Sequence, residues 1–205
     1  MTYRIVITGL DRNGWLERSL ASAESQEAPE GAEVVVQTVV DAEGMGAAHT
    51  RYRALEDGDP YDIVVLLDMD DYLAHPGAIK RVHEEYLKGA DVTYGSYQFH
   101  NGELAWSQVP YPDGCDYRRE VWRCAPLRTF RQSLFVADPN QFIMDGEWIR
   151  KCTDMALMIP ILERSNNPVF IPDVLYVYDH KHGDQSRRRV TQDYAKRVNW
   201  WIRSR

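Results

Sequence analysis

The sequence has few cysteines and no long hydrophobic run. Its three cysteines, Cys115, Cys124 and Cys152, include no C-x-x-C pair, so the sequence predicts neither a disulfide framework nor a zinc knuckle. We expect them to be reduced, buried thiols. The longest apolar runs, residues 63–67 and 155–162, are far shorter than the ~20 residues that a membrane-spanning helix needs. These absences argue against a disulfide-stabilised protein and against a transmembrane one.

The N-terminal region also lacks the apolar core of a secretory signal. Charged side chains interrupt it at Arg4, Asp11, Arg12, Glu17 and Arg18. We therefore expect a cytoplasmic protein. The 205 residues are 44% hydrophobic and 27% charged, without a low-complexity tract, a composition typical of one well-filled globular domain.

Charge is unevenly distributed along the chain. The net charge is −7, yet residues 187–205 hold seven basic side chains and one acidic one, so this tail carries +6 and the rest carries −13. Within the tail, Val190, Tyr194, Val198 and Trp201 have the spacing of an apolar stripe on a helix. Either the stripe packs on the domain with its charges solvated, or the tail binds anionic lipid or a nucleic-acid backbone.

The first 90 residues alternate β-rich runs with segments of helical periodicity. Continuous valine- and isoleucine-rich runs are typical of strands buried on both faces. Their alternation with helices predicts an α/β fold with a mostly parallel, Rossmann-like sheet, whose ligands bind at the carboxyl ends of the strands. The predicted strands are residues 3–8, 34–40 and 61–67, and the predicted helices are residues 15–23, 47–55 and 76–87, with Pro76 in the first turn.

The second half predicts a smaller antiparallel part. Residues 91–100 and 103–109 flank the Asn101-Gly102 dipeptide, which is well suited to a two-residue hairpin turn. Beyond them we expect a helix at residues 146–164 and a strand at residues 174–178. No linker-like segment separates this part from the first.

Aspartates follow all three predicted parallel strands. Asp11 comes shortly after the first strand, Asp41 directly after the second, and the Asp68-Met69-Asp70-Asp71 run directly after the third. Two carboxylates at i and i+2 on an extended segment point to the same side. Asp68 and Asp70 can therefore share Mg²⁺ or Mn²⁺, which takes the rest of its shell from water and substrate phosphates. The alternative is a solvated acidic turn.

Several short motifs follow one another along the chain, at residues 5–8, 34–41, 51–55, 61–73, 127–131, 153–158, 173–176 and 182–186. In their order and spacing they resemble family 2 of the nucleotide-sugar glycosyltransferases, and the resemblance extends from residue 3 to about residue 186. The first loop departs from the family pattern, with Gly9 and Asp11 where proline and asparagine are common. Residues 41–44 also replace a paired-aspartate turn, so the nucleobase and the sugar stay open.

The resemblance implies a single GT-A type domain over residues 1–205. Its nucleotide-binding half would be residues 1–100, its acceptor and catalytic half residues 101–186, and its basic tail residues 187–205. It also implies a metal-dependent, inverting glycosyltransferase that moves a sugar from a nucleoside diphosphate donor to an acceptor hydroxyl. The acceptor stays open between a saccharide, a lipid-linked glycan and a modified nucleic acid.

The same resemblance implies roles for individual residues. The cofactor would be Mn²⁺ or Mg²⁺, and a neutral imidazole is a good ligand for manganese. For residues 180–187, a polar surface loop is the alternative to a loop that closes over the donor. The implied metal ligands are Asp70, Asp68 and His182, the implied donor contacts are Thr8, Asp11, Asp41, Arg51 and Asp68, and the candidate diphosphate or acceptor contacts are Arg128, Lys181 and Arg187.

An inverting transfer needs a general base, because an alcohol is a poor nucleophile until its proton is removed. Asp154 matches the family's base position, directly before the apolar run that starts at Met155. The alternative is that Asp154 caps the predicted helix, and one residue can do both. Asp145 and Glu147 are the next candidates for the base.

Two other functions remain open from the sequence. A sugar-phosphate nucleotidyltransferase would share the nucleotide fold and the metal, but it needs a glycine-rich, arginine-containing loop after the first strand, and residues 8–14 are a poor version of one. A non-catalytic module that binds a nucleotide sugar or a nucleic acid would not need Asp68, Asp70 and Asp154 together.

Overall fold

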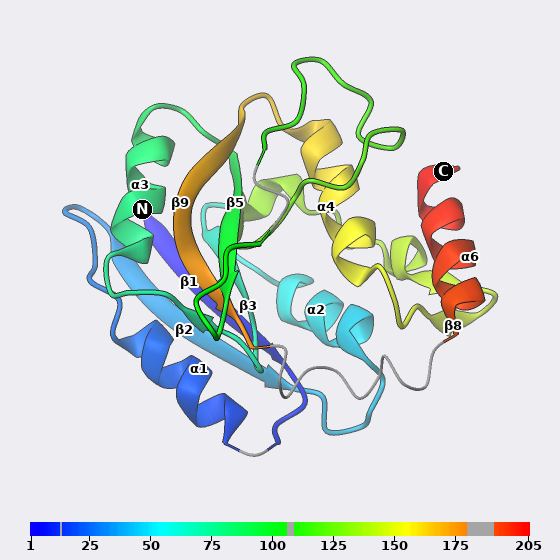
Figure 1. The fold of residues 1–205 in the computed structure, drawn as a ribbon, viewed down its shortest axis with the longest axis horizontal. Coiled ribbons are helices and arrows are strands. Elements are labelled where there is room, and N and C mark those ends of the chain that lie inside the picture. Colours follow the sequence, from blue (N-terminus) through cyan, green and yellow to red (C-terminus); the bar gives the residue numbers. More distant parts are fainter. Residues whose placement is uncertain (13, 106–108, 180–190) are drawn as a thin grey trace.

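A twisted seven-stranded sheet runs through the molecule, with helices on both of its faces (Figure 1). The computed structural model describes residues 1–12, 14–105, 109–179 and 191–205. The strand order in the sheet is β2-β1-β3-β6-β5-β9-β4. The strands are β1 (Thr2–Gly9), β2 (Glu33–Val40), β3 (Ile63–Asp68), β4 (Tyr72–Leu73), β5 (Val92–Phe99), β6 (Arg128–Arg131) and β9 (Pro168–Tyr178), and the α-helices are α1 (Trp15–Glu24), α2 (Ala47–Leu55), α3 (Ala78–Leu87), α4 (Thr153–Arg164) and α6 (Gln192–Arg203).

The parallel part of the sheet consists of β1, β2 and β3, as the sequence predicts. Side chains alternate between the two faces of these strands, so Ile5 and Val65 pack beneath one helical layer while Val6 and Val64 pack beneath the other. The register aligns Thr8 with Asp68. The carboxyl ends of β1 and β3 therefore reach the same edge of the sheet.

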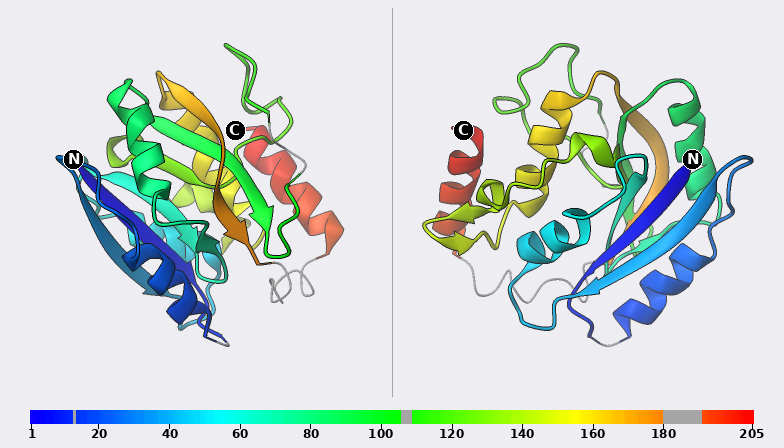
Figure 2. Two further views of the ribbon diagram at one scale, coloured as in Figure 1. Left: turned by 60° about the vertical axis from the view of Figure 1, so that its left-hand side comes forward. Right: turned by 180° about the vertical axis from the view of Figure 1, so that it is seen from behind.

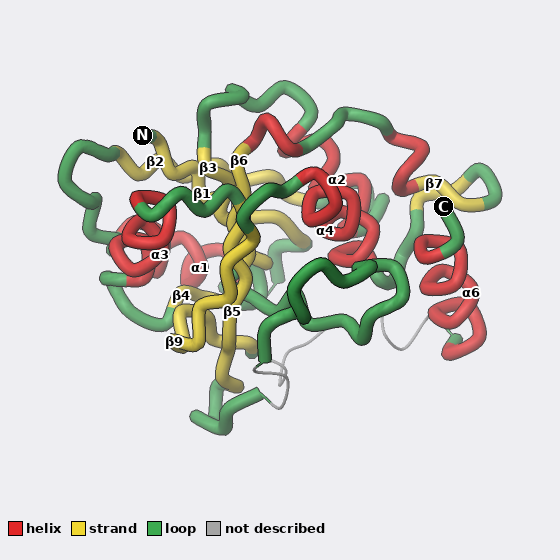
Figure 3. Tube along the Cα trace, turned by 90° about the horizontal axis from the view of Figure 1, so that it is seen from above, coloured by secondary structure: helices red, strands yellow, loops and turns green. Residues whose placement is uncertain are grey.

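The remaining strands make the sheet mixed. β6 lies antiparallel to both β3 and β5, β9 runs parallel to β5, and the short β4 pairs antiparallel with β9. Seen from above, α1 and α3 lie on one side of the sheet and α2 and α4 on the other (Figure 3). The same sheet thus includes residues from both halves of the chain.

The predicted hairpin forms only at its turn. The Phe99 amide donates to the Glu103 carbonyl at 2.8 Å, and Gly102 has the positive φ of 86° that such a turn needs. The predicted second arm, residues 103–109, is not a described strand, since a single bridge between Gln98 and Leu104 is its only ladder contact among the described residues. β5 instead finds its sheet partners in β6 and β9.

The predicted helix over residues 146–164 is wrong at its start. Asp145 and Gly146, with φ of 55° and 81°, form the two-residue turn between the short strands β7 (Ile143–Met144) and β8 (Glu147–Trp148). Two short 3₁₀ helices, η1 (Gln132–Leu134) and η2 (Pro139–Phe142), precede this hairpin. The chain enters α4 only after Cys152, which is also left-handed with φ 53°.

Smaller differences occur at other predicted ends. α3 begins at Ala78, two residues after Pro76, and β9 begins at Pro168, six residues before the predicted start of that strand. The predicted helix 47–55 agrees with α2, and helix 15–23 with α1 to within one residue.

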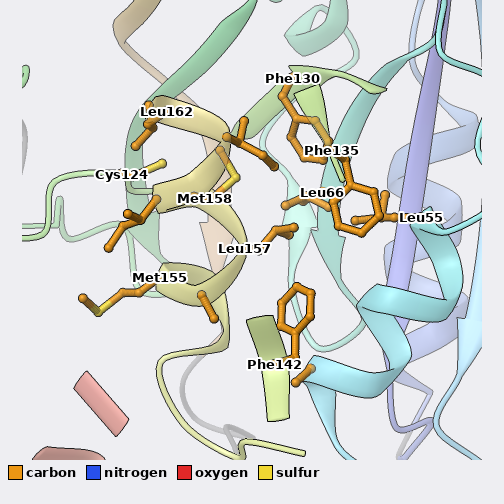
Figure 4. Close-up of a cluster of buried hydrophobic side chains, with 14 of the residues drawn as sticks. Leu55, Leu66, Cys124, Phe130, Phe135, Phe142, Met155, Leu157, Met158 and Leu162 are labelled. Carbon is orange, nitrogen blue, oxygen red and sulfur yellow. The ribbon is translucent and has the colours of Figure 1, made fainter. Parts of the chain in front are cut away.

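A large hydrophobic core fills the space between the sheet and α4 (Figure 4). Leu157 and Met158 of α4 point toward Phe130 and Leu66 of the sheet. α4 is apolar on nearly all sides, with eight of its twelve residues buried, because the sheet covers one side of it and α6 another.

α6 lies outside α4, away from the sheet (Figure 2). Val198 and Ile202 are buried in the same core as α4, whereas Trp200 is 72% exposed. Two of the four predicted stripe residues, Tyr194 and Trp201, pack partly against this core, and Val190 lies outside the described residues. None of the described helices has the length and apolar character needed to cross a bilayer.

Candidate functional site

The strand ends of β1, β2 and β3 are tied together by backbone hydrogen bonds. The Met69 amide donates to the Thr8 carbonyl at 3.0 Å, and the Asp41 amide donates to the Gly9 carbonyl at 2.7 Å. A Cβ atom on Gly9 would lie 2.8 Å from the Cβ atom of Met69, so only glycine permits this close approach. The predicted donor residues Thr8, Asp41 and Asp68 therefore lie at one edge of the sheet.

Asp68 is held by a buried arginine from α2. One guanidinium nitrogen of Arg51 lies 2.5 Å from Asp68 Oδ1, and another donates to Thr153 Oγ1 at 2.8 Å. Burial alone would lower the pKa of Arg51, but the charge of Asp68 and the hydrogen bond to it outweigh burial and raise that pKa. Arg51 is thus a permanent positive charge beside the carboxylate turn.

A second ion pair lies next to the first. Arg128 of β6 contacts Asp154 Oδ2 at 3.1 Å and donates from Nε to the Cys124 carbonyl at 2.7 Å. The charge of Asp154 acts on Arg51 as well as on Arg128, so the two pairs form one cluster. The Asp154 side chain is 29% exposed, which leaves it accessible to a ligand.

Asp154 is not the capping residue of α4. It is the second residue of the helix, the N-cap position is Cys152, and no side-chain hydrogen bond caps this end. The fallback bases lie elsewhere: Asp145 is 69% exposed and pairs with Arg197 at 2.8 Å, and Glu147 is exposed in β8. Of the three candidates, Asp154 is the one that joins the ion-pair cluster.

The three aspartates of the Asp68–Asp71 turn lie in different environments, since one is buried and two are partly exposed. Asp71 is 1% exposed, accepts a 2.6 Å hydrogen bond from the Tyr176 hydroxyl at Oδ2, and accepts a 2.9 Å bond from the Asp179 amide at Oδ1. Burial first, and then the charges of Asp70 and Asp68, raise the pKa of Asp71 well above its usual range. Asp71 therefore stabilises the turn from its buried side, while Asp68 and Asp70 remain partly exposed.

Asp68 and Asp70 are the partly exposed carboxylates of this turn, and they are the residues that could hold a hard divalent cation here. Mg²⁺ and Mn²⁺ are commonly bound by one or two carboxylates, with phosphate and water oxygens completing the shell, and Asp68 and Asp70 supply two such groups. Among the residues that the structure describes, no group of three or more histidine, cysteine, aspartate or glutamate side chains could hold a metal by itself. The predicted His182, Lys181 and Arg187 lie outside the described residues.

Asp41 and Asp11 lie apart from the ion-pair cluster. The two carboxylate oxygens of Asp41 accept from the amides of Met45 and Gly46, both at 2.9 Å, and so shape the loop before α2. Asp11 is exposed and lines an open surface pocket of about 470 Å³ beside the start of α1, together with Arg12, Gly14, Leu16, Glu17 and Leu20. The first-loop and second-loop aspartates thus face solvent-accessible space near the same sheet edge.

Four residues of this site escaped the sequence analysis as functional candidates. Thr153 binds Arg51, Tyr176 binds Asp71, and Arg18 and Asp179 form an ion pair at 2.5 Å next to the carboxylate turn. Thr153 and Tyr176 lie within two of the matching motifs, residues 153–158 and 173–176, but the sequence predicts no role for either side chain. Arg18 and Asp179 reach the site only through the tertiary fold.

No protein-family model matches the chain, and no curated protein matches it. Solved structures do match: S. aureus TarS 1-349 superposes with a TM-score of 0.61 at 16% identity, over 87% of this chain and 60% of that one. The same protein in complex with UDP-GlcNAc gives 0.63 at 15% identity, over 98% and 66%. The complex with UDP gives 0.60 at 17% identity, over 87% and 60%.

These matches concern the fold. This chain spans about 60% of the TarS 1-349 structure, and the identity is low, so the likeness by itself says nothing about the reaction. It does agree with the arrangement described above, a mostly parallel sheet between helical layers with a smaller antiparallel part. The chain therefore has a GT-A type α/β fold, as TarS does.

Proposed function

We propose that the chain is a metal-dependent, inverting glycosyltransferase of the family 2 type, which moves a sugar from a nucleoside diphosphate to an acceptor hydroxyl. The observation that carries the proposal is the ion-pair cluster at the carboxyl edge of the sheet. Four residues that the sequence marks separately, Asp68, Arg51, Arg128 and Asp154, come together there from two strands, β3 and β6, and two helices, α2 and α4. Because TarS was solved with UDP-GlcNAc and with UDP, a UDP-sugar is the first donor to test.

Asp154 is the proposed general base. The acceptor oxygen attacks C1 of the donor sugar from the face opposite the nucleotide, and its proton passes to the Asp154 carboxylate. The new C–O bond forms as the bond between C1 and the diphosphate oxygen breaks, and the electron pair of that bond leaves with the nucleoside diphosphate. Since Arg128 contacts Oδ2 of Asp154, we assign the proton to Oδ1.

The leaving diphosphate requires positive charge, and the cluster contains two buried guanidinium groups. Arg51 would remain paired with Asp68, at the edge of the sheet where the phosphates would lie. Because a guanidinium group is a good hydrogen-bond donor to phosphate oxygens, its positive charge would stabilise the diphosphate there. A bound Mn²⁺ or Mg²⁺, held by Asp68 and Asp70, would neutralise the diphosphate. His182, Lys181 and Arg187 are proposed as additional contacts to the metal and the diphosphate.

We also propose that residues 1–205 act as one glycosyltransferase domain, with donor contacts from Thr8, Asp11 and Asp41. A cytoplasmic location agrees with the free thiols of Cys115, Cys124 and Cys152, since reducing compartments keep cysteines unpaired. The acceptor class is left to experiment.

A donor screen tests the proposal. Hydrolysis of UDP-sugars and other nucleotide sugars is measured with and without Mn²⁺, and we expect turnover of at least one donor that a chelator abolishes. Asp70→Ala removes one proposed metal ligand at a partly exposed position, so it should abolish turnover with little change in melting temperature. Asp173→Ala, an exposed carboxylate paired with Arg81, is the matched control and should leave turnover unchanged.

Two results would contradict the proposal. Full turnover in the presence of a chelator would remove the metal role. Stabilisation by a nucleotide sugar without any hydrolysis or transfer would indicate a non-catalytic binding module instead.

A further inference from the structure

Arg18 of α1 connects two segments that meet beside the carboxylate turn. Its Nη1 atom lies 2.5 Å from Asp179 Oδ2, and its Nη2 atom donates to the backbone carbonyl of Asp70. The guanidinium also lies over the Tyr72 ring, 4.9 Å from the ring centroid. One side chain thus contacts the backbone of the Asp68–Asp71 turn, the residue that follows Asp71, and the residue that follows β9.

The acceptor of the ion pair is itself buried and fixed. Asp179 is 2% exposed, and its amide donates to Asp71 Oδ1 at 2.9 Å. Asp71 and Asp179 are therefore two buried acidic residues linked by this hydrogen bond, and Arg18 supplies a positive charge next to them. Burying a carboxylate is costly unless it has charged or hydrogen-bonding partners, and Arg18 is one such partner of Asp179.

The contacts restrain the Asp70 peptide group rather than the Asp70 side chain. Arg18 binds the carbonyl oxygen of Asp70, whose side chain is partly exposed. α1 is anchored against the same region at a second point, where Ser22 Oγ accepts from the Leu73 amide at 3.2 Å. One helix therefore holds the backbone at Asp70, within the turn, and at Leu73, two residues beyond it.

We infer that Arg18 is a positioning residue for the Asp68 and Asp70 carboxylates, acting through the Asp70 carbonyl and the Asp179 carboxylate. The inference rests on the proposed function, since it assigns Arg18 a role in presenting the metal-binding pair. Arg18 itself contacts neither the metal nor the donor. Its effect is to reduce the number of conformations of the turn, so that cation binding does not have to order it.

The test compares Arg18→Met with Arg81→Met. Arg81 of α3 is a matched control, because its side chain is similarly exposed and also forms ion pairs, with Glu84 at 3.4 Å, Glu85 at 2.6 Å and Asp173 at 2.7 Å, away from the carboxylate turn. Two quantities are measured: the dissociation constant of Mn²⁺ in the presence of UDP, by the EPR signal of free Mn²⁺, and hydrogen exchange of the amides in residues 69–73.

We expect Arg18→Met to raise the Mn²⁺ dissociation constant about tenfold or more and to accelerate exchange at the Asp71 amide, as expected when binding must also order the turn. Arg18→Lys, which keeps the charge but loses the fork, should fall between this variant and the wild type. Arg81→Met should stay within about twofold of wild type in both measurements.

A folded Arg18→Met variant with wild-type Mn²⁺ affinity and wild-type exchange at residues 69–73 would overturn the inference. If Arg18→Met does not fold, Arg18→Lys and Asp179→Asn carry the same test. If the wild-type protein itself binds no Mn²⁺ with UDP or with another nucleoside diphosphate, the proposed metal-dependent function fails there. The exchange measurement then decides separately whether Arg18 orders the turn.

Discussion

Asp68 and Asp154 come from distant parts of the chain. Each forms an ion pair with a buried arginine, and the charge of that arginine also acts on the other ion pair. Asp68 ends a parallel strand, whereas Asp154 lies in the first turn of α4, and Arg51 and Arg128 bring the two carboxylates into one electrostatic cluster. Charge-assisted bonds of this kind are shorter and stronger than neutral ones and fix the orientation of both partners. A base that must meet an acceptor hydroxyl at hydrogen-bond distance benefits from such fixation.

The first residue-scale prediction concerns Asp154→Asn. Asparagine keeps the shape of the side chain but cannot accept the acceptor proton, so turnover should fall by ~10²–10⁴-fold. The Michaelis constant for the donor should change little, because donor binding depends on Asp68 and Asp70 in the proposed site. Steady-state kinetics of sugar transfer would measure both quantities.

Asp145→Asn is the control for this substitution, since Asp145 is an exposed fallback base that pairs with Arg197. It should leave turnover within about twofold of wild type and stability nearly unchanged, because exposed ion pairs contribute ~0–1 kcal/mol. If Asp154→Asn transfers sugar at the wild-type rate while Asp145→Asn does not, the base assignment moves to Asp145.

At the scale of elements, α6 decides between the two interpretations of the basic tail. The helix buries Val198 and Ile202, and its side chains and backbone bond to residues near 118–120, where Arg203 donates to the carbonyls of Arg118 and Glu120. Its N-terminus is capped by Thr191, whose hydroxyl accepts from the Tyr194 amide at 3.2 Å. These contacts favour the interpretation in which the apolar stripe packs on the domain.

Ile202→Ala tests this packing. Removing a fully buried aliphatic side chain costs about 2–5 kcal/mol through lost burial and the cavity that remains. We expect a loss in this range in the free energy of unfolding, measured by urea denaturation. Trp200→Ala, on the 72% exposed face of the same helix, should change stability by less than about 0.5 kcal/mol.

A larger effect of Trp200→Ala than of Ile202→Ala would favour the interpretation in which the tail binds anionic lipid. If Ile202→Ala is nearly neutral while Trp200→Ala abolishes binding to vesicles that contain an anionic lipid, α6 is a docking helix and its packing on α4 contributes little. If both variants are stable and neither affects vesicle binding, the tail is neither an anchor nor a structural element of importance.

The elements that the sequence predicts correctly have one property in common: a local sequence pattern that determines their secondary structure. The valine-rich strands, the aspartates that end them and helix α2 were readable because burial on both faces and helical periodicity leave local signatures. The predicted helix 146–164 starts too early, although Asp145-Gly146 is a strong hairpin signal. The long apolar run that follows has a helical pattern, and this pattern extends the prediction back over the hairpin. The second hairpin arm, predicted over residues 103–109, does not form a described strand, because β5 pairs instead with β6 and β9, which are distant in sequence.

At the scale of the whole molecule, the site depends on contacts that no local pattern contains. The sequence motifs contain the four residues of the ion-pair cluster, Asp68, Arg51, Arg128 and Asp154. They do not predict the ion pairs, because these follow from the sheet order, which places β6 next to β3 and beneath α4. Arg18 and Asp179 are 161 residues apart in sequence and had no signal at all. Residues that support a site from a distance are therefore the part that sequence reasoning recovers least.

The core between the sheet and α4 also makes the stability of the whole molecule sensitive to alkali. Burial raises the pKa of the Cys124 thiol from 9.0 to about 12 and that of Cys152 to about 11. A group whose folded pKa is raised keeps its proton more tightly in the folded state. Its contribution to stability is therefore fully present below pH 9 and is lost as the pH rises toward the folded value.

We expect the free energy of unfolding to fall above pH 9, with Cys124 alone accounting for about 1 kcal/mol between pH 8 and pH 10, since one pKa unit corresponds to about 1.4 kcal/mol. Urea denaturation at a series of pH values would measure this fall in the wild type and in Cys124→Ala. The variant loses some stability at every pH through its cavity, but its curve should be flatter above pH 9 because it has no thiol to ionise on unfolding. Parallel curves for the two proteins would mean that Cys124 ionises as readily in the folded chain as in the unfolded one, and that the core around α4 admits water.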